Sequence, residues 1–163
     1  MALKADRHEV VTDISFFLNE TAERGIIVTH STAGSGSAMY DSNALVVVPT
    51  TASGSYPAGL LLNDMVNLDL TRQHLNQHQD EVQKGGKVTL LKQGWVVTNK
   101  VSDGGVISAG SPAYLASSGL LSVVNPDANA GRGSDVEQHE ARVGRFLSTL
   151  DADGYAKVYI DIA

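Results

Sequence analysis

Two histidines, His74 and His78, have the spacing in this chain that is best suited to metal chemistry. On a helix they would share one face, and they could bind zinc with a third ligand from Asp80 or Glu81. The residue after His74 is not the glutamate that the metalloprotease pattern requires. The segment 71–83 suits an extended loop as well as a short helix, and a polar surface or interface segment is the favoured interpretation.

The sequence Asp151-Ala-Asp-Gly looks like the beginning of a calcium-binding loop. Such a loop continues with another oxygen ligand and closes on a glutamate, but Tyr155 and Ile162 occupy those places. An Asp-Gly pair between two strands is typical of a hairpin turn, because the turn needs a residue that tolerates positive φ. We therefore interpret this sequence as a turn.

No other motif in the sequence indicates catalysis or a bound cofactor. The glycine-rich stretches 34–37 and 131–135 lack the Lys-Ser/Thr of a phosphate-binding loop. There is no Gly-x-Ser-x-Gly nucleophile motif. Because the chain has no cysteine, it has neither a thiol nucleophile nor a thiolate ligand for a metal. We expect a protein that is not an enzyme and that holds no cofactor or metal.

Length, charge and hydropathy narrow the class of protein further. A chain of 163 residues fits one domain with a sizeable core and needs no disulfide to fold. Its net charge of −6 argues against a nucleic-acid partner, because neutralising phosphates requires a basic surface. It has no apolar run long enough to span a membrane, and its charged first residues do not suit a signal peptide. We expect binding to neither nucleic acid nor membranes, and assembly in a cytoplasm.

Short alternating segments separated by Gly, Ser, Asn and Asp predict an all-β fold with at most one or two short helices. The terminal segments 142–147 and 155–162 are expected to form a hairpin, since apolar and polar residues alternate in the second of them. Another strand pair is predicted over 87–100, with Gln93-Gly94 as its turn. Further strands are expected from Gly25, within 43–49 and from Pro57.

The first part of the chain fits either an amphipathic helix over 6–23 or an extended arm. We favour the arm, because Val, Thr, Ile and Phe dominate its centre. The expected organisation is a single β domain over 1–163. It comprises an N-terminal arm (1–25), strands with a long loop at 71–86 (26–104) and a C-terminal barrel unit (105–163).

Candidate contact surfaces are the apolar arm, the polar segment 71–83 and the single tryptophan. An extended arm that is not buried in its own barrel commonly binds a neighbour, although it could instead pack on its own domain. The tryptophan could anchor either the core or an interface. The predicted interface residues are Ile14, Phe16, Phe17, Leu18, Arg72, His74, His78 and Trp95.

Two passages resemble the head decoration (cement) proteins and related capsid-associated proteins of tailed bacteriophages. The first passage is the C-terminal β unit, with Gly105-Val-Ile-Ser-Ala-Gly-Ser-Pro-Ala-Tyr-Leu, Val143-Gly-Arg-Phe-Leu-Ser and Asp153-Gly-Tyr-Ala-Lys-Val-Tyr-Ile. The second begins at Pro57-Ala-Gly-Leu-Leu-Leu and ends with Gly94-Trp-Val-Val-Thr-Asn. Together the passages cover about two-thirds of the chain.

This resemblance implies a small β-barrel and a virion structural protein that binds the outer surface of a capsid lattice and bridges its capsomers. The implied partner is the major capsid protein, and such proteins are often homotrimers. The resemblance assigns no single residue as a contact. The alternatives are a tail or head–tail joining protein and a surface carbohydrate-binding module, for which one Trp and five Tyr are few aromatic residues.

Overall fold

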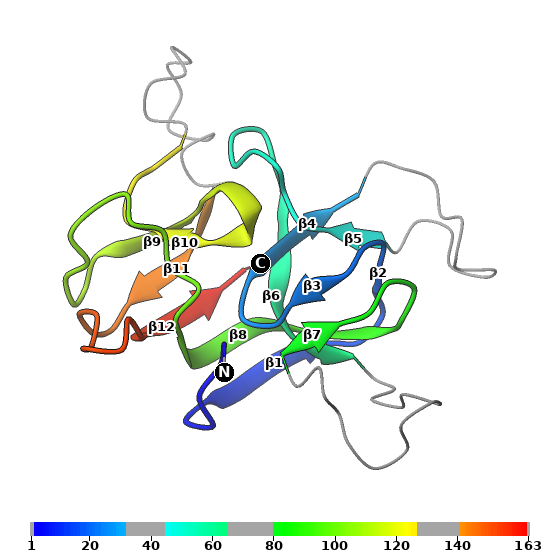
Figure 1. Cartoon of the computed structure of the whole chain (residues 1–163), viewed down its shortest axis with the longest axis horizontal. Helices are drawn as coiled ribbons and strands as arrows, with labels where there is room; N and C mark the ends of the chain where they lie inside the picture. Colours follow the sequence, from blue (N-terminus) through cyan, green and yellow to red (C-terminus); the bar gives the residue numbers. More distant parts are fainter. Residues whose placement is uncertain (1, 32–44, 65–79, 127–140, 163) are drawn as a thin grey trace.

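The computed structural model describes residues 2–31, 45–64, 80–126 and 141–162 (Figure 1). Apart from one short 3-10 turn at Ser117–Gly119, these residues form strands, turns and connecting segments, so the all-β prediction is confirmed. The strands are β1 (His8–Asp13), β2 (Phe17–Leu18), β3 (Ala22–Glu23), β4 (Ile27–His30), β5 (Leu45–Val47), β6 (Pro57–Asp64), β7 (Glu81–Val82), β8 (Val88–Thr98), β9 (Pro112–Leu115), β10 (Leu121–Ser122), β11 (Arg142–Phe146) and β12 (Ala156–Asp161).

Most of the strands belong to one sheet in the order β10-β9-β11-β12-β8-β6-β4-β5-β2, with β1 added on β8 and β3 paired separately with β7. Figure 1 shows β9 to β12 on one side of the molecule, β2 to β5 and β7 on the other, and β8 between them. The ends of the order, β10 and β2, lie on opposite sides and do not pair. Within the described residues the sheet is therefore open, and the expected closed barrel is corrected to an open sheet.

The long strand β8 joins the two sides of the sheet. It pairs antiparallel with β6 over 88–91 and with β12 over 93–98. The arm strand β1 pairs with β8 over 90–95, so the N-terminal arm is extended, as favoured from the sequence. The arm is thus part of the chain's own sheet.

Neighbouring residues of the central strands point into two separate hydrophobic clusters. The first cluster takes Ile27, Leu60 and Leu91, and the second takes Val28, Leu61 and Leu90. Strands β9 to β12 also contribute to the first cluster, and β2, β3, β5 and β7 contribute to the second. Strands β4 and β6, and β8 at Leu90 and Leu91, are therefore buried on both faces, which explains the continuous apolar runs in these segments.

The hairpin predicted at Gln93-Gly94 is wrong, because β8 continues through both residues. Gly94 has a φ of 148°. A Cβ atom there would collide with the backbone carbonyl oxygen of His8 in β1. The glycine therefore permits β1 to lie close against β8 instead of forming a turn.

The predicted terminal hairpin is present, since β11 pairs antiparallel with β12. In its turn, the carboxylate of Asp151 accepts hydrogen bonds from the backbone N–H groups of Asp153 (3.0 Å) and Tyr155 (2.7 Å). Gly154 completes the turn with a φ of 79°. The aspartate that looked like a calcium ligand thus organises the turn of the hairpin, as interpreted from the sequence.

We predict that Gly94→Ala lowers the free energy of unfolding by about 2 kcal/mol or more, because a side chain there must push β1 away from β8. Gly104→Ala is the control, since a Cβ at Gly104 would meet no heavy atom closer than 3.5 Å. The control should change stability by less than about 0.5 kcal/mol. Urea denaturation of both variants measures the difference, and equal stabilities would contradict the role given to Gly94.

Candidate functional site

Strand β12 presents a row of aromatic and charged side chains on its outer surface. Its apolar residues Ala156, Val158 and Ile160 are buried in the first cluster. Because side chains alternate along a strand, Lys157 and Tyr159 point to the opposite face, where both are only half-buried. The outer face of β12 is therefore free to contact another molecule.

The strand pairing aligns four side chains across this surface. Arg145 of β11 lies opposite Tyr159 of β12, and Tyr159 lies opposite Trp95 of β8. Trp95 in turn lies opposite His8 of β1, and the two rings are stacked with centroids 6.4 Å apart. Residues paired in this way stand side by side on one face of a sheet. Four strands thus supply one continuous row.

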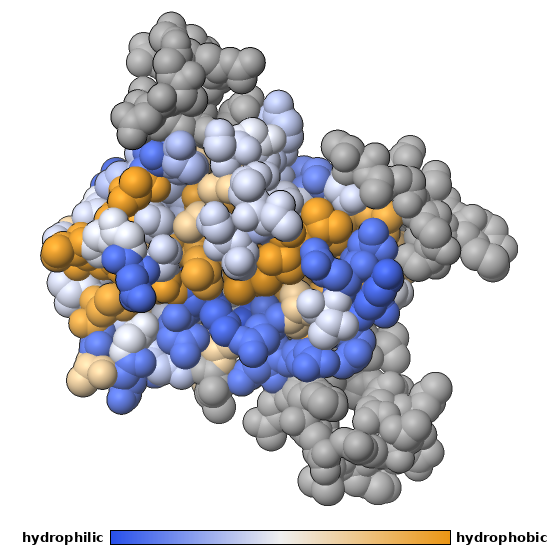
Figure 2. All heavy atoms as spheres, turned by 45° about the horizontal axis from the view of Figure 1, so that its top comes forward, coloured by the Kyte–Doolittle hydropathy of each residue, from blue (hydrophilic) through white to orange (hydrophobic). Residues whose placement is uncertain are grey.

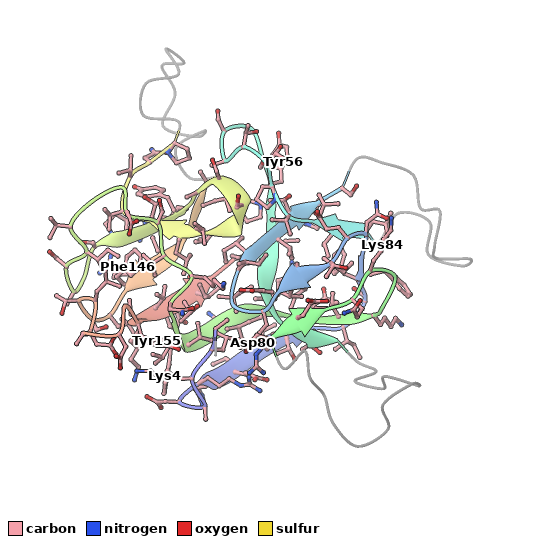
Figure 3. All side chains as sticks on the ribbon, viewed as in Figure 1. Lys4, Tyr56, Asp80, Lys84, Phe146 and Tyr155 are labelled. Atoms are coloured by element: carbon pink, nitrogen blue, oxygen red, sulfur yellow. The ribbon has the colours of Figure 1, made fainter. Side chains whose placement is uncertain are left out.

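Two lysines place their charges over aromatic rings of the same surface. The Nζ atom of Lys157 lies 3.5 Å from the ring centroid of Trp95, and Nζ of Lys4 lies 4.1 Å from that of Tyr155. Figure 3 shows Lys4 and Tyr155 next to each other beside β12 and β1. Such contacts are attractive because the cation faces the negative ring surface. We call the set Lys4, His8, Trp95, Arg145, Tyr155, Lys157 and Tyr159 the cation–aromatic face.

An ion pair holds one end of the cation–aromatic face in place. Nζ of Lys4 donates a hydrogen bond to Oδ2 of Asp151 at 2.9 Å. This bond raises the pKa of Lys4 and lowers the pKa of Asp151. Both groups are well exposed, so the pair positions the chain more than it stabilises the fold.

A pocket of about 430 Å³ opens at the other end of the cation–aromatic face. Its wall combines charged, aromatic and apolar groups from β11, β12 and the segment that follows β11. The lining residues are Arg142, Gly144, Arg145, Leu147, Tyr159 and Asp161. This mixture suits a ligand that carries both a charge and an apolar group.

Apolar surface is also exposed elsewhere on the molecule. Figure 2 shows a band of apolar atoms crossing one face, next to a strongly hydrophilic margin. Val10, Val11 and Ile14 are exposed in β1 and just after it, while Val106 (89% exposed), Val124, Leu147 and Leu150 are exposed in the segments around β9 to β12. Exposed apolar groups of this kind are compatible with contacts to a partner.

The structure distributes the predicted arm residues between the surface and the core. Ile14 is exposed, and Phe16 and Phe17 are half-buried. Leu18 is completely buried in the second hydrophobic cluster, so its assignment to an interface is wrong. The alternation in β2 turns Leu18 inward, which leaves only the residues before it available for contacts. Trp95 is half-buried at the centre of the cation–aromatic face.

Phe16 packs against the second hydrophobic cluster and also contacts the side chains of His30 and Lys92. Its ring meets that of His30 edge-on at 5.3 Å, and Nζ of Lys92 lies 5.6 Å from the Phe16 ring centroid. Burial and the charge of Lys92 lower the pKa of His30, against the opposite influence of Asp13. The arm is therefore fixed to the body of the protein at this point.

Three predicted residues, Arg72, His74 and His78, lie outside the described residues. Of the two oxygen ligands considered for zinc, Asp80 is engaged with Arg24, whose Nε lies 2.8 Å from its Oδ1. This hydrogen bond, in spite of the cost of burial, lowers the pKa of Asp80. Within the described ranges, no group of three or more His, Asp or Glu side chains is arranged to hold a metal ion.

Of the cation–aromatic face, sequence reasoning predicted only Trp95 and missed Lys4, His8, Arg145, Tyr155, Lys157 and Tyr159. The alternation in β12 did mark the last three as an outward row. The sequence did not show which strand lies next to that row, because the pairing of β12 with β8 joins residues far apart in the chain. The cation–aromatic face is visible only after the strand order is known.

Neither a protein-family model nor a curated protein sequence matches this chain. In the described part of the chain, no helix has the length and apolar character needed to cross a membrane.

We predict that His30 makes the stability depend on pH. A histidine with a lowered pKa binds fewer protons in the folded chain than in the unfolded chain. Its contribution to the free energy of unfolding is therefore fully present above pH 6.5 and is lost as the pH falls through the pKa of the folded state. The free energy of unfolding should therefore decrease from about pH 7.5 to about pH 5, and the free energy of unfolding of the His30→Gln variant should decrease less over this interval. Urea denaturation across the range measures both curves, and parallel curves would contradict the prediction.

Proposed function

We propose that this chain is a virion structural protein that binds the outer surface of a tailed-phage capsid lattice and stabilises it by bridging capsomers. The partner is the major capsid protein, and the protein acts as a homotrimer on the particle. The two passages that resemble decoration proteins support this proposal, because they belong to neighbouring strands of one sheet. The first passage contains β9, β11 and β12, which are adjacent in the sheet. The passage from Pro57 contains β6 and β8, which continue the same sheet.

The observation that carries the proposal is the cation–aromatic face. Trp, Tyr and Arg are the residue types that contribute most to protein–protein binding, and here Trp95, Tyr159 and Arg145 stand in one row. The row is built on paired strands, so little side-chain and backbone freedom remains to be lost on binding. Cations on this face of a chain with net charge −6 favour an acidic partner surface.

A capsid lattice suits a contact of this size. A single face of a few aromatic and cationic side chains gives modest affinity, but a trimer presents three copies of it at once. Symmetric repetition converts weak contacts into strong attachment when the spacing of sites matches. Attachment to several subunits at once is also what bridges neighbouring capsomers.

The contacts around Trp95 favour a protein partner over a carbohydrate. A carbohydrate-binding module stacks sugar rings on open aromatic surfaces. In this protein the Nζ atom of Lys157 lies 3.5 Å from the Trp95 ring centroid and covers one side of the ring. A carboxylate of a protein partner could bind the lysine while the ring edges make apolar contacts.

We predict that Trp95→Ala and Lys157→Glu each reduce binding to isolated heads of the phage that encodes the protein by at least about tenfold, because both remove the centre of the contact. Tyr56→Ala is the control, since Tyr56 is 60% exposed and lies far from Lys4 and Tyr155 in Figure 3. Co-sedimentation with heads measures the affinity, and circular dichroism checks the fold. Unchanged binding of both face variants would contradict the proposed contact.

Electron cryo-microscopy of the particles tests the function itself. We expect density for this protein on the outer shell, at local threefold axes. Density confined to the tail or to the head–tail joint would refute the decoration function and favour the joining protein. Mass measurement in solution and on particles would test the trimer.

A further inference from the structure

We infer that the pocket at the end of the cation–aromatic face binds an acidic peptide segment of the partner. One carboxylate of the segment lies between Arg142 and Arg145, and a neighbouring apolar side chain packs on Leu147 and Tyr159. The inference deepens the proposed function by naming the partner's chemistry, and it rests on that function only for the partner's identity. The pocket itself is defined by the fold.

An irregularity in β11 brings the two arginines to the same pocket. Residues three apart on a regular strand point to opposite faces. In β11, however, Val143 and Gly144 are both buried, and the register with β9 shifts between Arg142 and Gly144. Gly144 has a φ of 159°, and a Cβ atom there would collide with the carbonyl oxygen of Tyr159. The bulge therefore turns Arg142 and Arg145 outward together.

The charges of the two arginines are left without a carboxylate in the described part of the chain. Four other basic residues there each pair with an acidic one: Lys4 with Asp151, Arg7 with Glu9, Arg24 with Asp80 and Lys100 with Glu23. Within the described residues, the Arg142 side chain makes one long hydrogen bond, from Nε to the carbonyl oxygen of Gly144 at 3.5 Å. Two guanidinium groups that pair with no carboxylate of the described residues, beside one pocket in an acidic chain, provide charge complementarity to an anionic ligand.

The other groups of the pocket select a peptide carboxylate among anions. A guanidinium group matches a carboxylate with two parallel hydrogen bonds. Leu147, 42% exposed, and the ring of Tyr159 supply apolar wall for a side chain. The carboxylate of Asp161 lies in the same lining and accepts a hydrogen bond from Nε2 of Gln93 at 3.5 Å. It repels a polyanion such as nucleic acid, but it can accept a peptide N–H.

A nuclear magnetic resonance titration with a synthetic peptide tests this site in the full chain. The probe is the capped peptide acetyl-Gly-Glu-Leu-Glu-Gly-amide, and the reference is the same peptide with Gln for Glu. We expect the Glu peptide to shift the amide signals of Gly144, Leu147 and Asp161, and the Gln peptide to bind at least about fivefold more weakly. Equal binding of the two peptides would overturn the inference.

Matched variants locate the binding. Arg142→Gln and Arg145→Gln should each weaken the Glu peptide by about fivefold or more. Lys84→Gln removes the same charge from an exposed position on the opposite side of the molecule in Figure 3, and it should leave binding unchanged. An equal effect of all three substitutions would show a nonspecific charge effect and overturn the site. If the peptide results are as expected but the protein fails to bind heads, the capsid function fails and the pocket assignment stands.

Discussion

The close approach of β1 to β8 at Gly94 is the contact on which the rest of the structure depends. Strand β8 has to pair with β6, β12 and β1, and only a residue without a side chain fits beneath the carbonyl group of His8. The same approach places His8 beside Trp95, the next residue of β8. The absence of a side chain at Gly94 thus lets β1 pair with β8, and this pairing places the first residue of the row, His8, next to Trp95.

Whether the side chains of a strand pack in the core or remain available for binding depends on how many faces of the strand are buried. Strands β4, β6 and β8 separate two hydrophobic clusters, so most of their side chains serve packing. Strands β11 and β12 cover only the first cluster, and their second face remains at the surface. Binding groups on such strands inherit the rigidity of the core behind them, because their backbones are fixed by buried neighbours.

The sequence predicted elements whose signals are local, and it missed features that depend on distant pairing. Alternation in 155–162 and the Asp-Gly turn located the terminal hairpin correctly. The turn predicted at Gln93-Gly94 was wrong, because the sequence does not distinguish a glycine that a neighbouring strand requires from a glycine in a turn. The prediction of Leu18 as an interface residue was wrong, because the sequence does not show whether an apolar residue of an extended arm is exposed or packs in a hydrophobic cluster. The open sheet and the cation–aromatic face both required the strand order.

The pair between Lys4 and Asp151 has a consequence for how the molecule is made. The two residues are 147 positions apart, and near Lys4 the backbone carbonyl oxygen of Ala2 also accepts a hydrogen bond from the hydroxyl group of Thr98 in β8. Contacts of such high sequence separation form late and slow the search for the native state. The surface around Tyr155 can therefore form only after the segment from Asp151 to the end of β12 has been synthesised, so a product truncated before Asp151 would not display it.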